Sequence, residues 1–183
     1  LQKYIGPDTD VPAGDVGVGG REIGFMYGQY KRLRDENTGV LTGKGIGWGG
    51  SLIRPEATGY GALYYADELL KDFNDSIEGK RISISGYGNV AWGAAIKATQ
   101  MGAKVVTISG SKGYVLDEDG VNTKEKWDYM LMMRATNSGD LRGYAEEFGA
   151  KFFPGERPWN VPVDIAMPCA YQNELNKENA EAL

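Results

Sequence analysis

One stretch, residues 81–109, constrains the fold more than any other. Residues Arg81–Ser85 alternate around two isoleucines, Gly86-Tyr-Gly-Asn-Val-Ala91 follows directly, and apolar residues then recur at helical spacing as far as Gly102. A second apolar run covers residues 104–109. A strand, a glycine turn, a helix and a strand in this order predict a parallel crossover unit.

The glycine turn of this unit has the spacing of a dinucleotide-binding loop. In such a loop Gly86 permits the tight turn, Gly88 lets backbone amides reach a pyrophosphate, and Ala91 keeps helix and strand close. The helix N-terminus attracts the anion. Tight strand-to-helix turns without a ligand share this spacing, but the context favours a dinucleotide, with cofactor contacts at Gly86, Gly88 and Val90.

The end of the second strand bears on which dinucleotide is bound. NAD sites usually carry an acidic residue roughly 20 residues after the glycines, where it holds the ribose 2′-hydroxyl. Here that place reads Ser109-Gly-Ser-Lys112, without a carboxylate. Two hydroxyls and a cation suit a 2′-phosphate, so Ser109, Ser111 and Lys112 favour NADP, with NAD still open. Lys112 is equally consistent with a solvated turn.

The rest of the chain continues the alternation of helices and strands. Helical spacing covers residues 21–37, 54–72, 127–135 and 141–148, and residues 163–167 form a buried apolar run stopped by Pro168. In the second of these helices we expect Tyr64 and Leu69 on the buried face. The fold class is therefore α/β, with a partial, Rossmann-like doubly wound parallel sheet. The pattern changes near Ser51, which predicts one domain over residues 1–51 and a second over 52–183.

Residues 6–20 hold three aspartates among five glycines and two prolines. Such a run cannot form a regular helix or a central strand. A solvated turn is the simple interpretation. Because apolar residues flank the run, we instead expect a site in which Asp15 is placed for chemistry.

Composition narrows the function classes. The net charge is −5 without a basic block, which argues against nucleic acid as a partner, and no apolar run is long enough to span a membrane. The absence of histidine excludes a His base or a His metal ligand within this chain, and we expect no metal site. The single cysteine, Cys169, excludes an internal disulfide and suits a cytoplasmic protein.

Several segments together resemble the central part of hexameric, bacterial-type glutamate dehydrogenases, over the whole chain. They are Gly6–Asp15, Gly39–Lys44, Gly50–Gly61, Gly86–Ala91 and Pro168–Asn173. The resemblance implies that residues 1–51 end an α/β substrate domain and that residues 52–183 are a nucleotide domain cut short at its C-terminus.

The resemblance also implies a reaction and residue roles. L-Glutamate would be deaminated reversibly to 2-oxoglutarate and ammonia, with hydride passing to NAD(P). Asp15 would exchange protons with the substrate nitrogen, and Gly14 would lie against the substrate. Thr58 and Asn89 would contact the cofactor near the nicotinamide. From the residues alone, Thr58 could instead bond its own helix backbone and Asn89 could cap a helix.

The chain opens on Leu1 without Met and closes in the pattern of a helix, so we expect a fragment. The resemblance places the catalytic lysine upstream of Leu1 and implies a parent homohexamer. The fragment alone should therefore lack activity. Two alternatives stay open: a leucine-, phenylalanine- or valine-type dehydrogenase, and a dinucleotide-binding module without catalysis.

Overall fold

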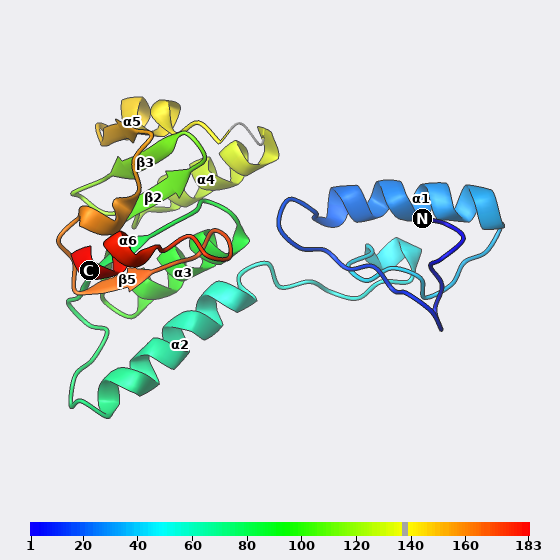
Figure 1. The fold of residues 1–183 in the computed structure, drawn as a ribbon, viewed down its shortest axis with the longest axis horizontal. Coiled ribbons are helices and arrows are strands. Elements are labelled where there is room, and N and C mark those ends of the chain that lie inside the picture. The colour runs from blue at the N-terminus through cyan, green and yellow to red at the C-terminus, as the bar shows by residue number, and fades with distance from the viewer. Residues whose placement is uncertain (137–138) are drawn as a thin grey trace. The chain divides into compact units, whose positions relative to one another are not determined.

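The structure, a computed structural model, describes residues 1–136 and 139–183. It forms two compact units, Leu1–Arg54 and Pro55–Leu183, each described below by itself (Figure 1). The division falls between Arg54 and Pro55 rather than after Ser51. The assignment of the units to a substrate domain and a nucleotide domain stays a prediction.

The first unit has one helix, α1 (Gly20–Arg34), and one 3₁₀ turn, η1 (Ile46–Trp48). The backbone before α1 is irregular, as the glycines and prolines predicted. The helix ends before residue 37 because Asp35 adopts a left-handed φ of 52° as its C-cap. Its buried face packs in a small core whose members are Ile5, Ile23, Tyr27, Tyr30, Val40 and Leu41.

The second unit is built on a five-stranded sheet of order β4-β3-β2-β1-β5. The strands are β1 (Arg81–Ile84), β2 (Lys104–Gly110), β3 (Gly113–Leu116), β4 (Lys151–Pro154) and β5 (Ile165–Met167). Strands β5, β1 and β2 are parallel, which confirms the predicted crossover unit. Strand β3 pairs antiparallel with both β2 and β4, so the sheet is mixed, and the expected parallel pairing holds for β5, β1 and β2. The two-residue turn between β2 and β3 can only reverse the chain.

Five helices and one 3₁₀ turn accompany the sheet in the described residues of this unit. The helices are α2 (Ala57–Lys71), α3 (Asn89–Gln100), α4 (Lys124–Thr136), α5 (Arg142–Phe148) and α6 (Lys177–Ala182), with a 3₁₀ turn, η2 (Pro158–Asn160). Alanines of α3 are fully buried in the main core with residues of β1, β2, α4 and α5. A second, smaller cluster joins Val106 and Tyr114 of the sheet to Val161, directly after η2.

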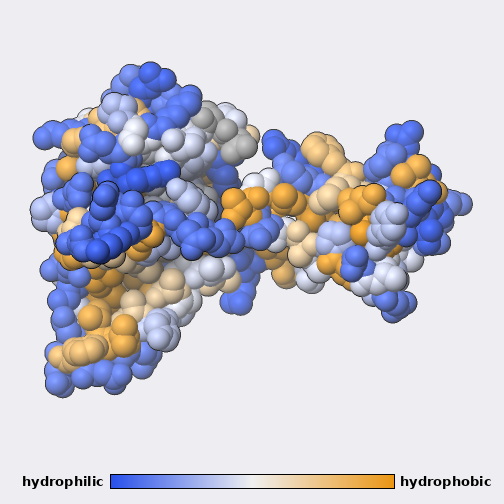
Figure 2. Space-filling view, viewed as in Figure 1, coloured by the Kyte–Doolittle hydropathy of each residue, from blue (hydrophilic) through white to orange (hydrophobic). Residues whose placement is uncertain are grey.

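Helix α2 differs from the prediction in the face that it buries. Tyr64 and Leu69, expected inside, are 52% and 48% exposed, and the fully buried residues of the helix are Gly59 and Leu63. Apolar side chains gather in the lower part of Figure 2, where the C-terminal half of α2 lies. The helix has apolar residues on more than one side, so its spacing alone did not single out the buried face.

Candidate functional site

The loop between β1 and α3 has the geometry of a phosphate-binding turn. Gly86 is buried and has a φ of +85°, a backbone conformation that glycine adopts without strain. Its N–H donates to the Ser109 hydroxyl at 2.8 Å, and its carbonyl accepts from the Ser109 N–H at 3.1 Å. These two bonds hold the loop against the end of β2.

Gly88 is the N-cap residue of α3, and because it has no side chain it makes no capping hydrogen bond to the helix. Its φ of −78° is open to any residue, and a Cβ added there would meet nothing within 4 Å. Neither backbone strain nor internal packing therefore requires glycine at this position. The first N–H groups of a helix have no partner within it, and the helix dipole favours an anion beside them.

The first turn of α2 lies directly against the first turn of α3. A Cβ at Gly59 would lie 2.4 Å from the Val90 carbonyl oxygen, and one at Gly93 would lie 2.7 Å from the Glu56 carbonyl oxygen. Glycine at both places lets the helix backbones touch. Thr58, which is exposed, is thereby brought to the same end of the sheet as Asn89 and Val90.

Asn89 is the first residue of α3 rather than its cap, since Gly88 occupies the N-cap position. Its side chain is exposed, and its Oδ1 accepts a hydrogen bond from the guanidinium of Arg134 on α4. Sequence reasoning missed Arg134, because nothing in its local sequence indicates a partner 45 residues away. The contact places a cation beside the N-terminus of α3.

Residues 109–112, at the end of β2 and in the turn after it, lie in two environments. Ser109 is 1% exposed and its hydroxyl faces the glycine loop, so it supports the loop from beneath. Ser111 and Lys112 are exposed and form the turn between β2 and β3. Only these two side chains are placed to reach an external ligand.

A carboxylate does lie near this turn, contrary to the sequence expectation. Asp140 pairs with Lys112 at 3.4 Å, and the preceding Gly139 packs so closely that a Cβ at Gly110 would lie 2.5 Å from the Gly139 carbonyl oxygen. Hydrogen bonds from Arg142 and, more weakly, Lys112 hold the pKa of the Asp140 carboxyl well below its usual range. Asp140 belongs to the segment before α5 and lies 28 residues after Lys112 in the sequence, so residues near the end of β2 gave no indication of it.

In the first unit, Gly14 and Asp15 belong to a tight turn. The Asp15 N–H donates to the Val18 carbonyl at 3.1 Å, the Val18 N–H donates back at 2.8 Å, and Gly17 has a φ of +75°. A Cβ at Gly14 would lie 2.8 Å from the Val18 carbonyl oxygen, so the turn itself requires this glycine. Asp15 is exposed, and its Oδ1 accepts from the Val16 N–H at 2.8 Å. Residues 1–54 by themselves therefore do not enclose Asp15.

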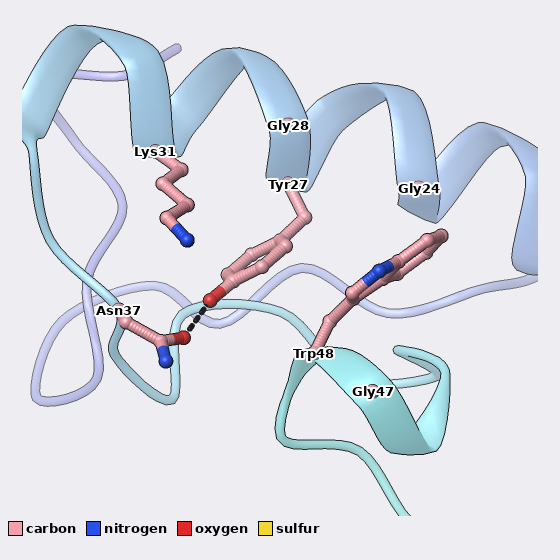
Figure 3. A pocket seen from close by; sticks show the side chains of 7 residues that line it. All are labelled: Gly24, Tyr27, Gly28, Lys31, Asn37, Gly47 and Trp48. Atoms are coloured by element: carbon pink, nitrogen blue, oxygen red, sulfur yellow. Dashed lines mark hydrogen bonds between the residues drawn. The ribbon is translucent and has the colours of Figure 1, made fainter.

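The first unit also contains a pocket of about 310 Å³ (Figure 3). Its lining residues are Gly24, Tyr27, Gly28, Lys31, Asn37, Gly47 and Trp48. Tyr27 donates a hydrogen bond to Asn37 across the pocket, and Trp48 lies against Gly24. None of the expected site residues lines this pocket.

Two classes of site are absent from the described part of the chain. Residues 1–136 and 139–183 contain no group of three or more His, Cys, Asp or Glu side chains suited to a metal ion. Within the same residues, every helix is too short or too polar to cross a membrane.

Known proteins match this chain along its whole length. A glutamate dehydrogenase of Bacteroides fragilis described as NAD-specific is 58% identical, and one of Haemophilus influenzae described as NADP-specific is 52% identical. Each match covers all of this chain, which spans 41% and 40% of those relatives. A solved glutamate dehydrogenase structure, 55% identical, has a TM-score of 0.88 over the whole chain and 41% of its own length.

The family comparison agrees. Residues 1–32 match the Glu/Leu/Phe/Val dehydrogenase dimerisation domain. Residues 49–183, well over half of the chain, match the Glutamate/Leucine/Phenylalanine/Valine dehydrogenase family and include the whole glycine loop described above. This chain therefore belongs to the glutamate/leucine/phenylalanine/valine dehydrogenase family.

Proposed function

We propose that this chain is the dinucleotide-binding and proton-transferring part of an NAD(P)-dependent glutamate dehydrogenase. One observation carries the cofactor assignment: Gly88 caps α3 beside open space, and neither its φ nor its packing requires glycine. A methyl group at that position would occupy the space that a pyrophosphate needs. The cited relatives, all described as glutamate dehydrogenases, support the choice of substrate.

The residues present fit a bound dinucleotide. The N–H groups at the start of α3 would hold the pyrophosphate, with Gly86, Gly88 and Val90 forming the cradle. Thr58 and Asn89 would orient the nicotinamide carboxamide, and the bound cofactor would supply the hydride acceptor. Ser109 would support the loop through its hydrogen bond to Gly86, whereas Ser111 would face the adenosine ribose.

Asp15 is the proposed proton carrier for the reaction. Oxidative deamination converts L-glutamate, water and the oxidised cofactor to 2-oxoglutarate, ammonium, the reduced cofactor and a proton. An aspartate beside the substrate nitrogen can take up and return protons as the nitrogen changes its bonding. Gly14 would leave room for the substrate at this turn.

The choice between NADP and NAD needs revision. The preference for NADP rested on two hydroxyls and a cation with no carboxylate beside them. In the structure Lys112 pairs with Asp140, and the Ser109 hydroxyl faces the glycine loop. One of the cited relatives is described as NAD-specific and another as NADP-specific. We therefore propose a site for either dinucleotide, with Lys112 and Asp140 as the pair that sets the balance.

The cofactor assignment is tested by titrating NADH and NADPH into the 183-residue chain, by calorimetry or by nicotinamide fluorescence. We expect saturable binding of at least one of them, abolished or strongly weakened by Gly88→Ala. A wild-type chain that binds neither dinucleotide would contradict the proposal. Their two dissociation constants also measure the preference directly.

The catalytic assignment is tested in the full-length protein. Asp15→Asn should lower the rate of glutamate-dependent NAD(P)H formation by about a hundredfold or more while leaving cofactor binding intact. A substrate screen separates glutamate from leucine, phenylalanine and valine. The 183-residue chain should show no turnover, because the proposed catalytic lysine lies outside it.

We propose a homohexamer for the full-length protein, to be measured by light scattering.

A further inference from the structure

Beneath the glycine loop lies a buried carboxylate that no role described above uses. Glu174 is 8% exposed, and its Oε1 accepts from the Ser85 hydroxyl at 2.8 Å and from the Ala170 N–H at 3.1 Å. The Ser85 Oγ in turn accepts from the Cys169 N–H at 2.9 Å. Glu174 and Ser85 together therefore bind two successive backbone N–H groups of the loop after β5.

Local backbone geometry directs this side chain inward. Asn173, the preceding residue, has a φ of 56°, a left-handed conformation that asparagine tolerates better than most residues. The turn reverses the chain after β5 and points Glu174 back toward the end of β1. The contact to Ser85 spans 89 residues of sequence.

The position of this network in the sheet is informative. From β1 the sheet order runs one way through β2, β3 and β4, and then returns to place β5 on the other side of β1. The carboxyl ends of β1 and β5 thus form the point where the strand order reverses, at which open α/β sheets bind their ligands. Ser85 directly precedes Gly86, and a Cβ at Gly86 would lie 3.1 Å from the Cys169 carbonyl oxygen.

If this position served only to fill space beside the loop, a carboxylate would be an unfavourable residue there. A buried carboxylate costs free energy unless it is well hydrogen-bonded, and Glu174 Oε2 is buried without a hydrogen-bond partner among the described residues. An apolar side chain would fill the same space without that cost. The acceptor at Oε1 is what an apolar residue could not provide.

We infer that Glu174 is a positioning residue for dinucleotide binding. By accepting from Ser85 and Ala170, it holds the Cys169–Ala170 backbone against Gly86, and so sets the shape of the glycine loop that receives the pyrophosphate. The inference rests on the proposed cofactor site. Glu174 itself lies beneath the loop and does not contact the ligand.

The test compares NADH dissociation constants and melting temperatures of variants of the 183-residue chain. Glu174→Ala removes the acceptor and should weaken NADH binding by about tenfold or more, the effect of losing hydrogen bonds to a charged group. Glu174→Gln keeps an oxygen acceptor and should bind within about threefold of wild type. Ser85→Ala removes the donor from the other side and should also weaken binding several-fold, and its effect should not add to that of Glu174→Ala.

Asp117→Asn is the matched control. Asp117 is a buried carboxylate of the same unit, 2% exposed, bonded to Lys126 and Tyr144 away from the glycine loop. Its substitution should lower the melting temperature but leave NADH affinity unchanged. The inference is overturned if Ser85→Ala or a folded Glu174→Ala binds NADH as wild type does, or if Glu174→Gln is as weak as Glu174→Ala. A wild-type chain that does not bind NADH or NADPH instead refutes the proposed cofactor site.

Discussion

Gly86 and Gly88 need to be glycine for different physical reasons. Gly86 has a left-handed φ and lies against the Cys169 carbonyl, so the protein itself requires it. Gly88 has an ordinary φ and faces open space, so we propose that a bound dinucleotide is what requires glycine there. The sequence motif assigned the tight turn to Gly86 and the approach of a pyrophosphate to Gly88, and the left-handed φ of Gly86 agrees with the first of these assignments.

This difference predicts opposite behaviour of two alanine variants. Gly88→Ala should cost less than about 1 kcal/mol of stability, as a poorer N-cap, yet weaken dinucleotide binding about tenfold or more by overfilling the cradle. Gly86→Ala should cost about 1–2 kcal/mol, because it forces a Cβ into a left-handed conformation. Urea denaturation and NADH titration measure both effects. Equal NADH affinity in Gly88→Ala and wild type would contradict the ligand argument.

Cys169 has the environment of a structural residue rather than of a nucleophile. Burial, with the negative charge of Glu174 as a lesser cause, raises the pKa of the thiol from 9.0 to about 12. The native thiol therefore stays protonated at neutral pH and is a poor nucleophile.

Two measurements follow for Cys169. Iodoacetamide at pH 8 should label the native chain slowly and the urea-unfolded chain rapidly. Because the folded pKa of about 12 lies above the unfolded value of 9.0, this thiol should lower stability as pH rises above 9.0. Cys169→Ser should remove that part of the alkaline loss, and rapid labelling of the native chain would refute the assignment.

At the scale of elements, the crossing of α2 and α3 explains how Thr58 reaches the site. Gly59 and Gly93 let the two helix backbones meet, and the first turns of both helices then share one end of the sheet. Sequence spacing identified both helices to within a few residues. It did not predict that Gly59 contacts α3, because a glycine within a helix more often only lowers the stability of that helix.

Helix α2 offers a matched pair to test this crossing. Gly59→Ala should destabilise the chain by about 1–3 kcal/mol, since its Cβ would lie 2.4 Å from backbone atoms of α3. Gly61→Ala lies on an exposed position with nothing within 4 Å and should stabilise by about 0.5–1 kcal/mol. Thermal denaturation of both variants decides the matter. A neutral or stabilising Gly59→Ala would exclude the close packing.

The edge of the sheet shows where element prediction stopped. Strands β1 and β2 were predicted because each is an apolar run next to a recognisable helix, and β5 because it is an apolar run stopped by Pro168. Strands β3 and β4 have four residues each, and their pairing is antiparallel. Runs this short carry little periodicity, so their place depends on the partner strand.

The whole molecule consists of two units with separate hydrophobic cores. The core of Leu1–Arg54 has six buried residues, and that of Pro55–Leu183 is much larger. The smaller unit, Leu1–Arg54, buries too little apolar surface to be more than marginally stable by itself.

Unfolding should reflect this difference. On heating the 183-residue chain we expect two unfolding transitions, the first of them from residues 1–54. A shortened chain of residues 55–183 should show only the second transition. The shortened chain should bind dinucleotide with the affinity of residues 1–183, because every proposed cofactor contact lies after residue 54. Calorimetry tests the first expectation and NADH titration the second. A single cooperative transition lost on removing residues 1–54 would contradict independent units.

The sequence by itself determined the local features of this protein. The glycine turn, the start and end of most helices and the three parallel strands each depend on neighbouring residues, because backbone φ, capping and apolar periodicity act over a few residues. Only the tertiary structure brought Arg134 to Asn89, Asp140 to Lys112 and Glu174 to Ser85. Each pair joins residues 28 to 89 positions apart that meet only after the sheet and helices have packed, and no local pattern encodes such a meeting.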